Sequence, residues 1–348
     1  MMGCGRVGAA IADQRWNGRK RMTYRQRTGR QRAIGLLFRL LGHLVVGLLR
    51  VRAIRLLLFA AALLFGLHSC SPPTLRIVTF NIRTFGIQTD RVRLRELLQA
   101  ADADVIALQE IRDSQALGAL AAELSSKASR SYRAVSSDCG GKQRLHLGFL
   151  YDTDRVRLDS VREFPELRED RGGSCFDGER AGFLGSFSSR GRFSVRRSKL
   201  HLLAVHFPAG AALGQAQSRQ MFLQRALRIL ESLRQGGEDR LVLLGDLNTT
   251  GYRDDQHGER SAVHRQLVQS GMKPLTDELL CSAYWKPSPF SPYLPGKLDH
   301  VIASGVIEAT EPPSVQGFCA ALKCEQAQRI PSDFDAVSDH CPVVVTVR

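Results

Sequence analysis

The sequence predicts an α/β protein in which a β-sheet core is flanked by helices. Short apolar runs typical of buried strands recur along the chain, and segments with helical apolar spacing lie between them. The body from residue 74 to residue 348 is also long enough to bury a sizeable core. Because it contains no internal repeat and no linker, we expect a single domain over residues 74–348.

The predicted elements alternate along this body. Strands are predicted at Leu75–Phe80, Asp104–Leu108, Leu147–Tyr151, Val156–Leu158, Leu200–Val205, Arg240–Leu244, Val301–Ser304 and Pro342–Val347. Helices are predicted at Arg91–Ala100, Ala116–Ser125 and Gln217–Gln235. We expect the strands at 147–151 and 156–158 to pair with each other, and the Pro- and Ser-rich stretch 286–295 to be a loop inside the domain.

The net charge of +15 comes from 49 Lys and Arg against 34 Asp and Glu. Residues 1–55 hold 13 of the basic residues and one acid, Asp13, so this segment carries +12 and the remainder only +3. The charge of the whole chain is therefore no argument that the body binds nucleic acid. The composition excludes a disordered chain, a small disulfide scaffold and a polytopic membrane protein.

Residues 1–70 have the features of an export segment. A basic flank ending at Arg55 precedes the apolar core Leu56–Gly66, and Leu67-His-Ser-Cys70 resembles a bacterial lipoprotein cleavage site. This pattern predicts export to the cell envelope, the periplasm or the extracellular space, with Cys70 as the lipidated residue and a membrane contact through this segment. An uncleaved membrane anchor over Ile34–Gly66 is the alternative, and residues 1–50 are also explained by an over-extended gene start.

Polar residues lie at the ends of six predicted strands, where loops usually carry function. These positions are Asn81-Ile-Arg83, Gln109-Glu110, His206, Gly245-Asp-Leu-Asn248, Lys297-Leu-Asp-His300 and Ser338-Asp-His340. A single Asp at a strand end is usually a turn residue or a helix cap, and a single His is usually structural. Six such positions in one domain indicate a shared site instead.

The residue types at these positions point to one chemistry. Carboxylate and carboxamide oxygens suit a hard divalent cation such as Mg²⁺, Mn²⁺ or Ca²⁺. Two histidines with carboxylate partners suit proton transfer near neutral pH. Together they predict metal-assisted hydrolysis of a phosphate ester, in which a cation and arginines stabilise the anionic transition state.

The same residues resemble those of a known family. The motifs are Phe80-Asn-Ile-Arg-Thr-Phe-Gly86, Gln109-Glu-Ile-Arg-Asp-Ser114, Val205-His206, Gly245-Asp-Leu-Asn248, Leu298-Asp299 and Ser338-Asp-His340. In kind and order they resemble the endonuclease/exonuclease/phosphatase superfamily, and within it deoxyribonuclease I-like nucleases most closely. The resemblance covers nearly all of residues 74–348 and implies a four-layer α/β sandwich, with two packed mixed β-sheets, helices outside and an active site at one edge.

The resemblance also implies roles for individual residues. Three would bind the metal, with Mg²⁺ expected and Mn²⁺ or Ca²⁺ as alternatives: Glu110, Asn81 and Asp339. Five would carry the catalysis, with the two histidines as acid and base and a carboxylate orienting the second: His206, His340, Asp299, Asp246 and Asn248. Three would contact substrate phosphates: Arg83, Arg112 and Arg180.

Two positions depart from the family pattern. Gln143 stands where a carboxylate would orient the histidine that corresponds to His206, so the protonated form of His206 loses a stabilising partner. Gly141 stands where the family places a tyrosine in the DNA minor groove. This second departure weakens the case for duplex DNA and leaves Arg112 as the groove residue.

Six of the eight cysteines lie in the predicted domain. They are Cys139, Cys175, Cys281, Cys319, Cys324 and Cys341. An even number in an exported domain predicts disulfides, with 15 possible pairings. Cys139 and Cys175 flank one loop region and form a candidate pair, whereas buried free thiols are the alternative for one or two of the six. A disulfide at Cys341 would stiffen the site beside His340.

The leading interpretation is an exported, metal-dependent phosphodiesterase. It would be a monomeric, deoxyribonuclease I-like endonuclease that cleaves nucleic acid, with DNA favoured over RNA. The alternatives are a phosphatase or a sphingomyelinase-type lipid phosphodiesterase on the same fold, and a non-catalytic binding module. Tyr284, Trp285, Phe290 and Tyr293 form either a small lipid- or base-stacking surface or the packing of a loop.

Overall fold

The computed structural model describes residues 74–127, 130–168, 174–190, 199–249 and 258–348, with a few helical positions before residue 74. The chain divides into two units, Met1–Ser71 and Pro72–Arg348, and the elements below belong to the second. The predicted leader, including Cys70, lies outside the described residues apart from those few positions. No helix in the described part of the chain has the length and apolarity needed to cross a membrane.

The first of two six-stranded sheets has the order β13-β14-β1-β2-β4-β3. Its strands are β1 (Leu75–Phe85), β2 (Val105–Ile111), β3 (Tyr132–Ser136), β4 (His146–Asp152), β13 (Ser314–Val315) and β14 (Val343–Val347). Strand β1 pairs in parallel with β2 and antiparallel with β14, so the sheet is mixed.

The second sheet has the order β5-β6-β7-β8-β12-β9, and only β7 and β8 pair in parallel. Its strands are β5 (Val156–Phe164), β6 (Gly182–Ser189), β7 (Lys199–His206), β8 (Leu241–Asp246), β9 (Met272–Pro274) and β12 (Asp299–Ser304). The expected pairing of β4 with β5 is wrong, because β4 pairs with β2 and β3 while β5 pairs with β6. Both strands bury apolar residues, Phe149 and Val156 among them, in the layer between the sheets, so the chain crosses from one sheet to the other here.

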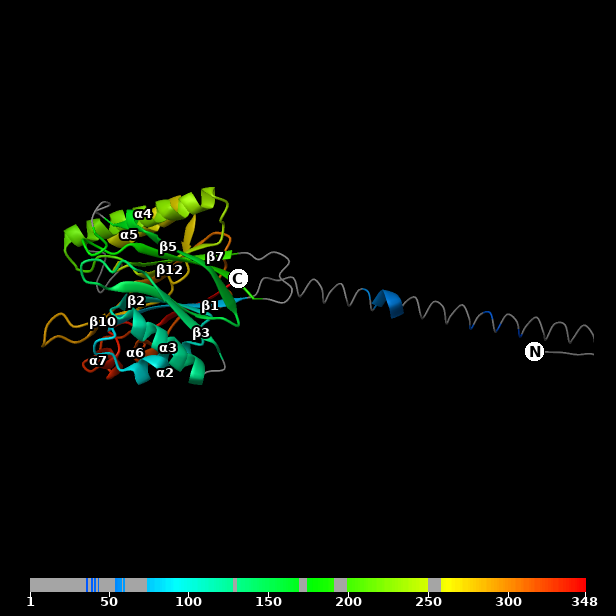
Figure 1. Cartoon of the computed structure of the whole chain (residues 1–348), viewed down its shortest axis with the longest axis horizontal. Coiled ribbons are helices and arrows are strands. Elements are labelled where there is room, and N and C mark those ends of the chain that lie inside the picture. Colours follow the sequence, from blue (N-terminus) through cyan, green and yellow to red (C-terminus); the bar gives the residue numbers. More distant parts are fainter. Residues whose placement is uncertain are drawn as a thin grey trace, which may run out of the picture. The chain divides into compact units, whose positions relative to one another are not determined.

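Helices cover the outer face of each sheet. They are α2 (Arg91–Ala101), α3 (Ser114–Lys127), α4 (Leu213–Gln235), α5 (Glu259–Ser270) and the short α6 (Gly317–Ala321), α7 (Asp333–Ala336) and 3₁₀ turn η1 (Pro165–Leu167). Apolar residues of α2 and α3 pack on the first sheet, and those of α4 and α5 pack on the second. Figure 1 shows these two pairs of helices on opposite sides of the sheets. The predicted four-layer sandwich of two mixed sheets between helices is confirmed. A separate hairpin is formed by β10 (Ala283–Trp285) and β11 (Leu294–Gly296).

The central apolar layer lies between the two sheets and follows the period-two alternation of the strands. In β1, Leu75 and Ile77 face this inner layer, whereas Val78 and Phe80 pack on the outer helices. Continued along the strand, the same alternation places Asn81 on the inner face. The sandwich therefore turns the polar residues at its strand ends toward the space between the sheets.

Candidate active site

Three polar side chains form a row on the inner face of the second sheet. The strand registers place His206 of β7 opposite Asp246 of β8, and Asp246 opposite Asp299 of β12. Two positions before His206 and Asp246, Ala204 and Leu244 face the apolar layer between the sheets, so the polar side chains point the same way. An imidazole and two carboxylates thus meet at one edge of the sheet.

Asn81 joins this row to the first sheet. Its buried Nδ2 donates to Oε1 of Glu110 at 3.1 Å and to Oδ2 of Asp246 at 3.1 Å. An amide nitrogen has two protons, and both are used here. Oδ1 of Asn81 accepts the backbone N–H of Arg83 at 3.0 Å, which fixes the orientation of the amide.

Glu110 reaches the cluster from a distorted point in β2. The register between β2 and β4 shifts between Leu108 and Ile111, and Glu110 has a φ of 64°. A bulge of this kind re-aims a side chain, and a left-handed non-glycine residue costs about 1–3 kcal/mol. Oε2 of Glu110 accepts the backbone N–H of Thr84 at 3.1 Å, and Oε1 lies 3.9 Å from Nε2 of His206. The strain therefore turns this carboxylate toward the second sheet.

Gly245 allows the approach that sets Asp246 in place. Its φ is 143°, and a Cβ at this position would lie 2.0 Å from the carbonyl oxygen of Val205 on β7. Oδ1 of Asp246 accepts the backbone N–H of Asn248 at 2.9 Å, and the Asn248 amide donates to the carbonyl oxygen of Phe207 at 3.1 Å. The Gly-Asp-Leu-Asn motif is thus a tight turn that orients both polar side chains.

His340 is held by Asp299 and by two serines. Nδ1 of His340 lies 2.7 Å from Oδ2 of Asp299 in a buried contact. Ser338 Oγ donates to the carbonyl oxygen of Asn81 at 2.7 Å and accepts the backbone N–H of His340 at 3.1 Å. Ser282 Oγ accepts the backbone N–H of Asp299 at 2.9 Å. These contacts favour a proton on Nδ1 of His340 and leave Nε2 to face the cluster.

The two histidines face one carboxylate but differ in their electrostatics. Oδ2 of Asp246 lies 3.4 Å from Nε2 of His206 and 3.6 Å from Nε2 of His340. Burial lowers the pKa of His206 well below its ordinary value, and the positive charges of Arg180 and His340 lower it further. Burial also opposes protonation of His340, but the carboxylates of Asp299 and Asp246 outweigh it and hold the pKa of His340 well above its ordinary value. The site therefore pairs a neutral imidazole with a protonated one.

Arg180 lies behind His206 and is almost fully buried. Its Nη1 donates to the carbonyl oxygen of His206 at 3.0 Å, and its Nη2 donates to Oε1 of Gln143 at 3.2 Å. Nδ1 of His206 is buried and has no hydrogen-bond partner among the described residues. Gln143 thus stands where a carboxylate would orient His206, and its neutral side-chain oxygen accepts a hydrogen bond from Arg180 instead.

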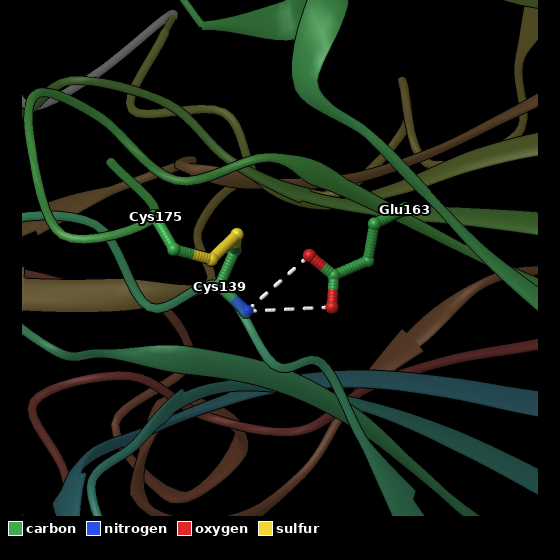
Figure 2. Close-up of side chains that lie close together, drawn as sticks. All are labelled: Cys139, Glu163 and Cys175. Carbon is green, nitrogen blue, oxygen red and sulfur yellow. Dashed lines mark hydrogen bonds between the residues drawn. A yellow bond between two sulfur atoms is a disulfide. The ribbon is translucent and has the colours of Figure 1, made fainter. Parts of the chain in front are cut away.

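Two disulfide-linked loops hold Arg180 in place. The Cys139–Cys175 disulfide joins them, and both carboxylate oxygens of Glu163 accept the backbone N–H of Cys139 at 3.3 Å (Figure 2). Gly141 has a φ of 66°, and a Cβ there would lie 2.9 Å from the backbone nitrogen of Arg180. A tyrosine would not fit at this position. This lack of space explains why glycine stands where the resemblance places a groove residue.

The other two predicted phosphate-binding arginines lie outside the buried cluster. The guanidinium of Arg83 donates to the carbonyl oxygen of Asp335 at 2.6 Å and lies 5.9 Å from the ring centre of Phe334, so it contacts α7. Arg112 is exposed and donates to the backbone carbonyl oxygen of Gln143 at 2.5 Å. Gln143 thus contacts Arg180 with its side chain and Arg112 with its backbone.

The predicted metal ligands are brought together only in part. Asn81 contacts Glu110 directly, whereas Asp339 is half-buried and bears on the site through its charge, which contributes to the raised pKa of His340. Among the described residues, two groups of three His, Cys, Asp or Glu side chains have ligand atoms that all lie within 4.8 Å of one another. They are the Cys139–Cys175 disulfide with Glu163, and Asp246 with Asp299 and His340.

The acidic part of the cluster has the chemistry of a divalent-cation site. Burial raises the pKa of Asp246 to about 7, and the charge of Asp299 adds to this effect although His340 opposes it. Oδ1 of Asp299 is buried and has no hydrogen-bond partner in the described part of the chain. Burial thus disfavours the charge of Asp246, and one carboxylate oxygen of Asp299 lacks a donor among the described residues. Carboxylates in this state suit a hard cation, and Glu110 and Asp246, which share Asn81 as a donor, are placed to hold it.

Ser282 and Ser338 have no role predicted from the sequence, although both fix catalytic candidates. Ser338 lies inside the motif that contains His340, so its position was a usable signal. The Ser282 hydroxyl oxygen accepts hydrogen bonds from the backbone N–H groups of Leu298 and Asp299. The Ser282 carbonyl oxygen accepts one from the backbone N–H of Cys341. A serine that acts on distant backbone groups leaves no local pattern in a sequence.

Comparison with known proteins identifies the family and the fold. The family model described as the Endonuclease/Exonuclease/phosphatase family matches residues 78–340, a span that contains every residue of the cluster. No curated protein matches the chain in sequence.

Several solved structures share the fold at low sequence identity. An endonuclease/exonuclease/phosphatase family protein from Bacteroides thetaiotaomicron is 18% identical, with a TM-score of 0.53 over 80% of this chain and 98% of that one. The human Nocturnin catalytic domain with bound sulfate is 13% identical, with a TM-score of 0.53 over 79% and 94%. D. rerio TDP2 complexed with a single strand DNA product is 18% identical, with a TM-score of 0.52 over 80% and 100%. At these identities the similarity is evidence of the fold.

Proposed function

The chain belongs to the endonuclease/exonuclease/phosphatase family, whose members hydrolyse phosphate esters, and from this premise we propose that it is a metal-dependent phosphodiesterase that cleaves nucleic acid. One observation carries the proposal. The Asp246 carboxylate lies between a neutral and a protonated histidine, and Asn81 links it to Glu110. Such a site can accept a proton on one side and donate one on the other.

The proton donor is His340. Asp299 holds its Nδ1, so Nε2 is directed into the site and can protonate the leaving alkoxide. On the other side, Nε2 of neutral His206 accepts the proton of the attacking water, and Oδ2 of Asp246, 3.4 Å from that nitrogen, stabilises the imidazolium that forms. The buried guanidinium of Arg180 attracts the anionic phosphate from behind His206.

A divalent cation, with Mg²⁺ expected, would supply the positive charge that polarises the phosphate when bound. We place Glu110 and Asp246 as its ligands because their oxygens share Asn81 as a donor. Asp339 stays a proposed ligand on the basis of its motif. The negative charge at Asp246 and Asp299 gives the cation an electrostatic reason to bind there.

We propose single-stranded DNA as the substrate and endonucleolytic cleavage as the reaction. The D. rerio TDP2 structure holds a single strand DNA product, which supports a nucleic acid on this fold. Gly141 removes the side chain that would enter a duplex groove and, by its close contact with Arg180, excludes a replacement. An unpaired strand needs no groove residue, because its bases and phosphates are open to contact.

We also propose that the protein acts outside the cytoplasm, with residues 1–70 as its leader and Cys70 as a lipidated residue. Three disulfides support this proposal. They join Cys139 to Cys175, Cys281 to Cys324 and Cys319 to Cys341. Disulfides in this number are typical of proteins in oxidising compartments.

The test uses the full chain with Mg²⁺ or with EDTA. Substrates are circular single-stranded DNA, plasmid DNA, RNA, sphingomyelin and a phosphomonoester. We expect Mg²⁺-dependent cleavage of the circular single strand, which an exonuclease does not attack. Glu110→Gln and His340→Ala should each lower turnover at least about 10²-fold, while the exposed Glu278→Gln and His264→Ala leave it unchanged.

Other outcomes would contradict the proposal. Turnover of the phosphomonoester or of sphingomyelin alone would indicate a phosphatase or a lipid phosphodiesterase. DNA cleavage that both site variants retain in full would indicate a contaminating nuclease. No turnover of any substrate would favour a binding module.

A further inference from the structure

Phe290 is almost completely exposed, with 98% of its surface open to solvent. It lies in the loop that connects β10 and β11, the orange loop that projects beside the β10 label in Figure 1. A single exposed apolar residue is common on protein surfaces and needs no explanation by itself. Two features distinguish Phe290 from the other exposed apolar residues. A stiff turn holds its ring, and the base of its hairpin lies at the active site.

The tip of the hairpin is a closed, stiff turn. The backbone N–H of Ser291 donates to the carbonyl oxygen of Ser288 at 3.1 Å, and the two serine hydroxyls lie 2.7 Å apart. Pro289 and Phe290 are the two central residues of this turn, and two further prolines flank it. The ring of Phe290 is therefore held at the tip with little backbone freedom left to lose on binding.

The arms of the hairpin are fixed by aromatic packing. The ring of Tyr293 meets Phe334 edge-to-face at 5.2 Å, Phe334 meets Phe318 at 6.0 Å, and Phe318 meets Tyr284 at 5.9 Å. The aromatic group identified in the sequence is thus divided in two. Its tyrosines pack on α6 and α7, whereas Phe290 remains outside this packing.

The base of the hairpin is part of the wall of the active site. Ala283 forms a β-bridge with His340, and the backbone N–H of Tyr284 donates to the carbonyl oxygen of Asp339 at 2.9 Å. Strand β11 ends three residues before Asp299. Both the histidine and the carboxylate that orients it are therefore attached to the segments that carry the projecting phenyl ring.

We propose that Phe290 stacks on an unpaired base of the nucleic acid strand whose phosphodiester lies at His340. The proposal rests on the proposed function and names the part of the substrate that the hairpin contacts. Seven residues separate Phe290 from Ala283, so at most about 25 Å of chain lies between the tip and the site, a distance that spans several nucleotides. Stacking of bases on aromatic rings is tolerant of sequence, so this contact would not restrict cleavage to one base.

The surroundings of Phe290 favour a nucleic acid over a membrane. The Lys286 ammonium lies 4.9 Å from the ring centre of Tyr293 on the same hairpin and adds positive charge next to the tip. The neighbours of Phe290 in the turn are serines and prolines, so a single phenyl ring is the only large apolar group offered there. One ring is too small an apolar surface to hold a protein at a bilayer.

The test compares two substrates of the full chain. Bis(p-nitrophenyl) phosphate is small enough to occupy the active site without reaching Phe290 at the tip of the hairpin, whereas a 12-nucleotide single strand is long enough to reach both. We expect Phe290→Ala to raise KM for the oligonucleotide about tenfold and to leave kcat/KM for bis(p-nitrophenyl) phosphate unchanged. Phe290→Trp should restore the oligonucleotide KM. Val268→Ala on α5, which removes another exposed apolar side chain, is the matched control and should change neither value.

An unchanged oligonucleotide KM in Phe290→Ala would overturn the proposal. If Phe290→Ala also lost binding to phosphatidylglycerol vesicles, that result would assign the hairpin to a membrane instead. If the wild-type chain hydrolyses neither substrate, the proposed function fails, and fluorescence anisotropy with a labelled 12-nucleotide strand still decides the role of Phe290. Weaker binding by Phe290→Ala would support stacking, and equal or absent binding would refute it.

Discussion

Oδ2 of Asp299 lies 2.7 Å from Nδ1 of His340, although 41 residues separate the two in the sequence. The contact is buried, and Ser282 fixes the backbone of Asp299. In a buried site, a carboxylate at this distance stabilises the imidazolium strongly, and it contributes to the raised pKa of His340. In the proposed reaction, this pair would keep a proton available for the leaving group.

Asp299→Asn should lower turnover about 10²-fold and move the alkaline limb of the pH–rate profile to lower pH. The asparagine keeps the shape of the side chain but removes the charge that raises the pKa of His340. His340 then loses its proton at lower pH, and the acid form becomes scarce earlier in a titration. A pH series of kcat/KM measures the shift. Asp154→Asn, an exposed change, should leave the profile in place, and an unmoved alkaline limb in Asp299→Asn would argue against a donor role for His340.

Glu110→Gln should remove the stabilisation of the fold by Mg²⁺. A ligand that binds only the folded state stabilises it by about 2.7 kcal/mol at a concentration of 100 times Kd, and this gain requires the carboxylate charge. The comparison is the Tm with MgCl₂ and with EDTA. Glu278→Gln, an exposed change of the same kind, should keep the full Mg²⁺ shift. Equal shifts in Glu110→Gln and the wild type would place the metal elsewhere.

The strand-end residues could be predicted from the sequence because the signals that mark them are local. Apolar alternation identifies a strand, and the polar residue that follows it continues the same inner face. Elements with weaker alternation were missed. Helix α5 buries only Val263 and Leu267 among its twelve residues, and β6 contains two glycines and three serines in eight residues. Their place is decided by neighbours from distant parts of the chain, which a local pattern does not report.

The detailed contacts of the site were less accessible to sequence reasoning. Glu110 reaches His206 only because a bulge in β2 gives it a left-handed backbone, and no residue type at that position signals a bulge. Arg83 matches a family motif, but its guanidinium contacts α7. The motifs therefore named side chains that the fold brings into one cluster, whereas the partner of each side chain depended on long-range packing.

Gln143→Glu should weaken substrate binding while leaving the fold intact. The new carboxylate would pair with Arg180, whose Nη2 already lies 3.2 Å from the side-chain oxygen at this position. The exposed position screens this interaction, so we expect KM for a phosphodiester to rise about three- to fivefold with little change in kcat. Gln224→Glu on α4 adds the same charge at another exposed position and controls for net charge. A KM that rises equally in both variants would mean that Arg180 is not the group affected.

Cys319→Ser combined with Cys341→Ser should lower both stability and turnover. The disulfide closes a loop of 22 residues, for which the chain-entropy model gives a stabilisation of about 3 kcal/mol. Cys341 also follows His340 directly, so we expect its release to loosen the backbone of the proposed proton donor. Urea unfolding and steady-state assays measure the two effects. Cys4→Ser, in the predicted leader, should alter neither, and an unchanged urea midpoint in the double variant would contradict a stabilising disulfide.

His300 should make the protein less stable in acid. This residue follows Asp299 in the sequence and is buried, with Nε2 3.4 Å from the carbonyl oxygen of Thr249. Burial and the positive charge of Lys297 lower the pKa of His300 to about 4. In the unfolded chain the imidazole titrates near 6.5. Its contribution to folding is therefore complete above about pH 6.5 and is lost as the pH falls to about 4, a loss of about 3 kcal/mol.

His300→Gln isolates this effect, because a neutral amide has no proton to gain. Asp246 acts with the opposite sign over the same range, since its raised pKa makes folding more favourable as the carboxylate protonates. The wild-type curve contains both effects, so the informative quantity is the difference in free energy of unfolding between the wild type and His300→Gln. Measured by urea unfolding in EDTA, this difference should shift by about 3 kcal/mol in favour of the variant between pH 7.5 and pH 4. Parallel curves for the two proteins would show that His300 titrates alike in the folded and unfolded chains.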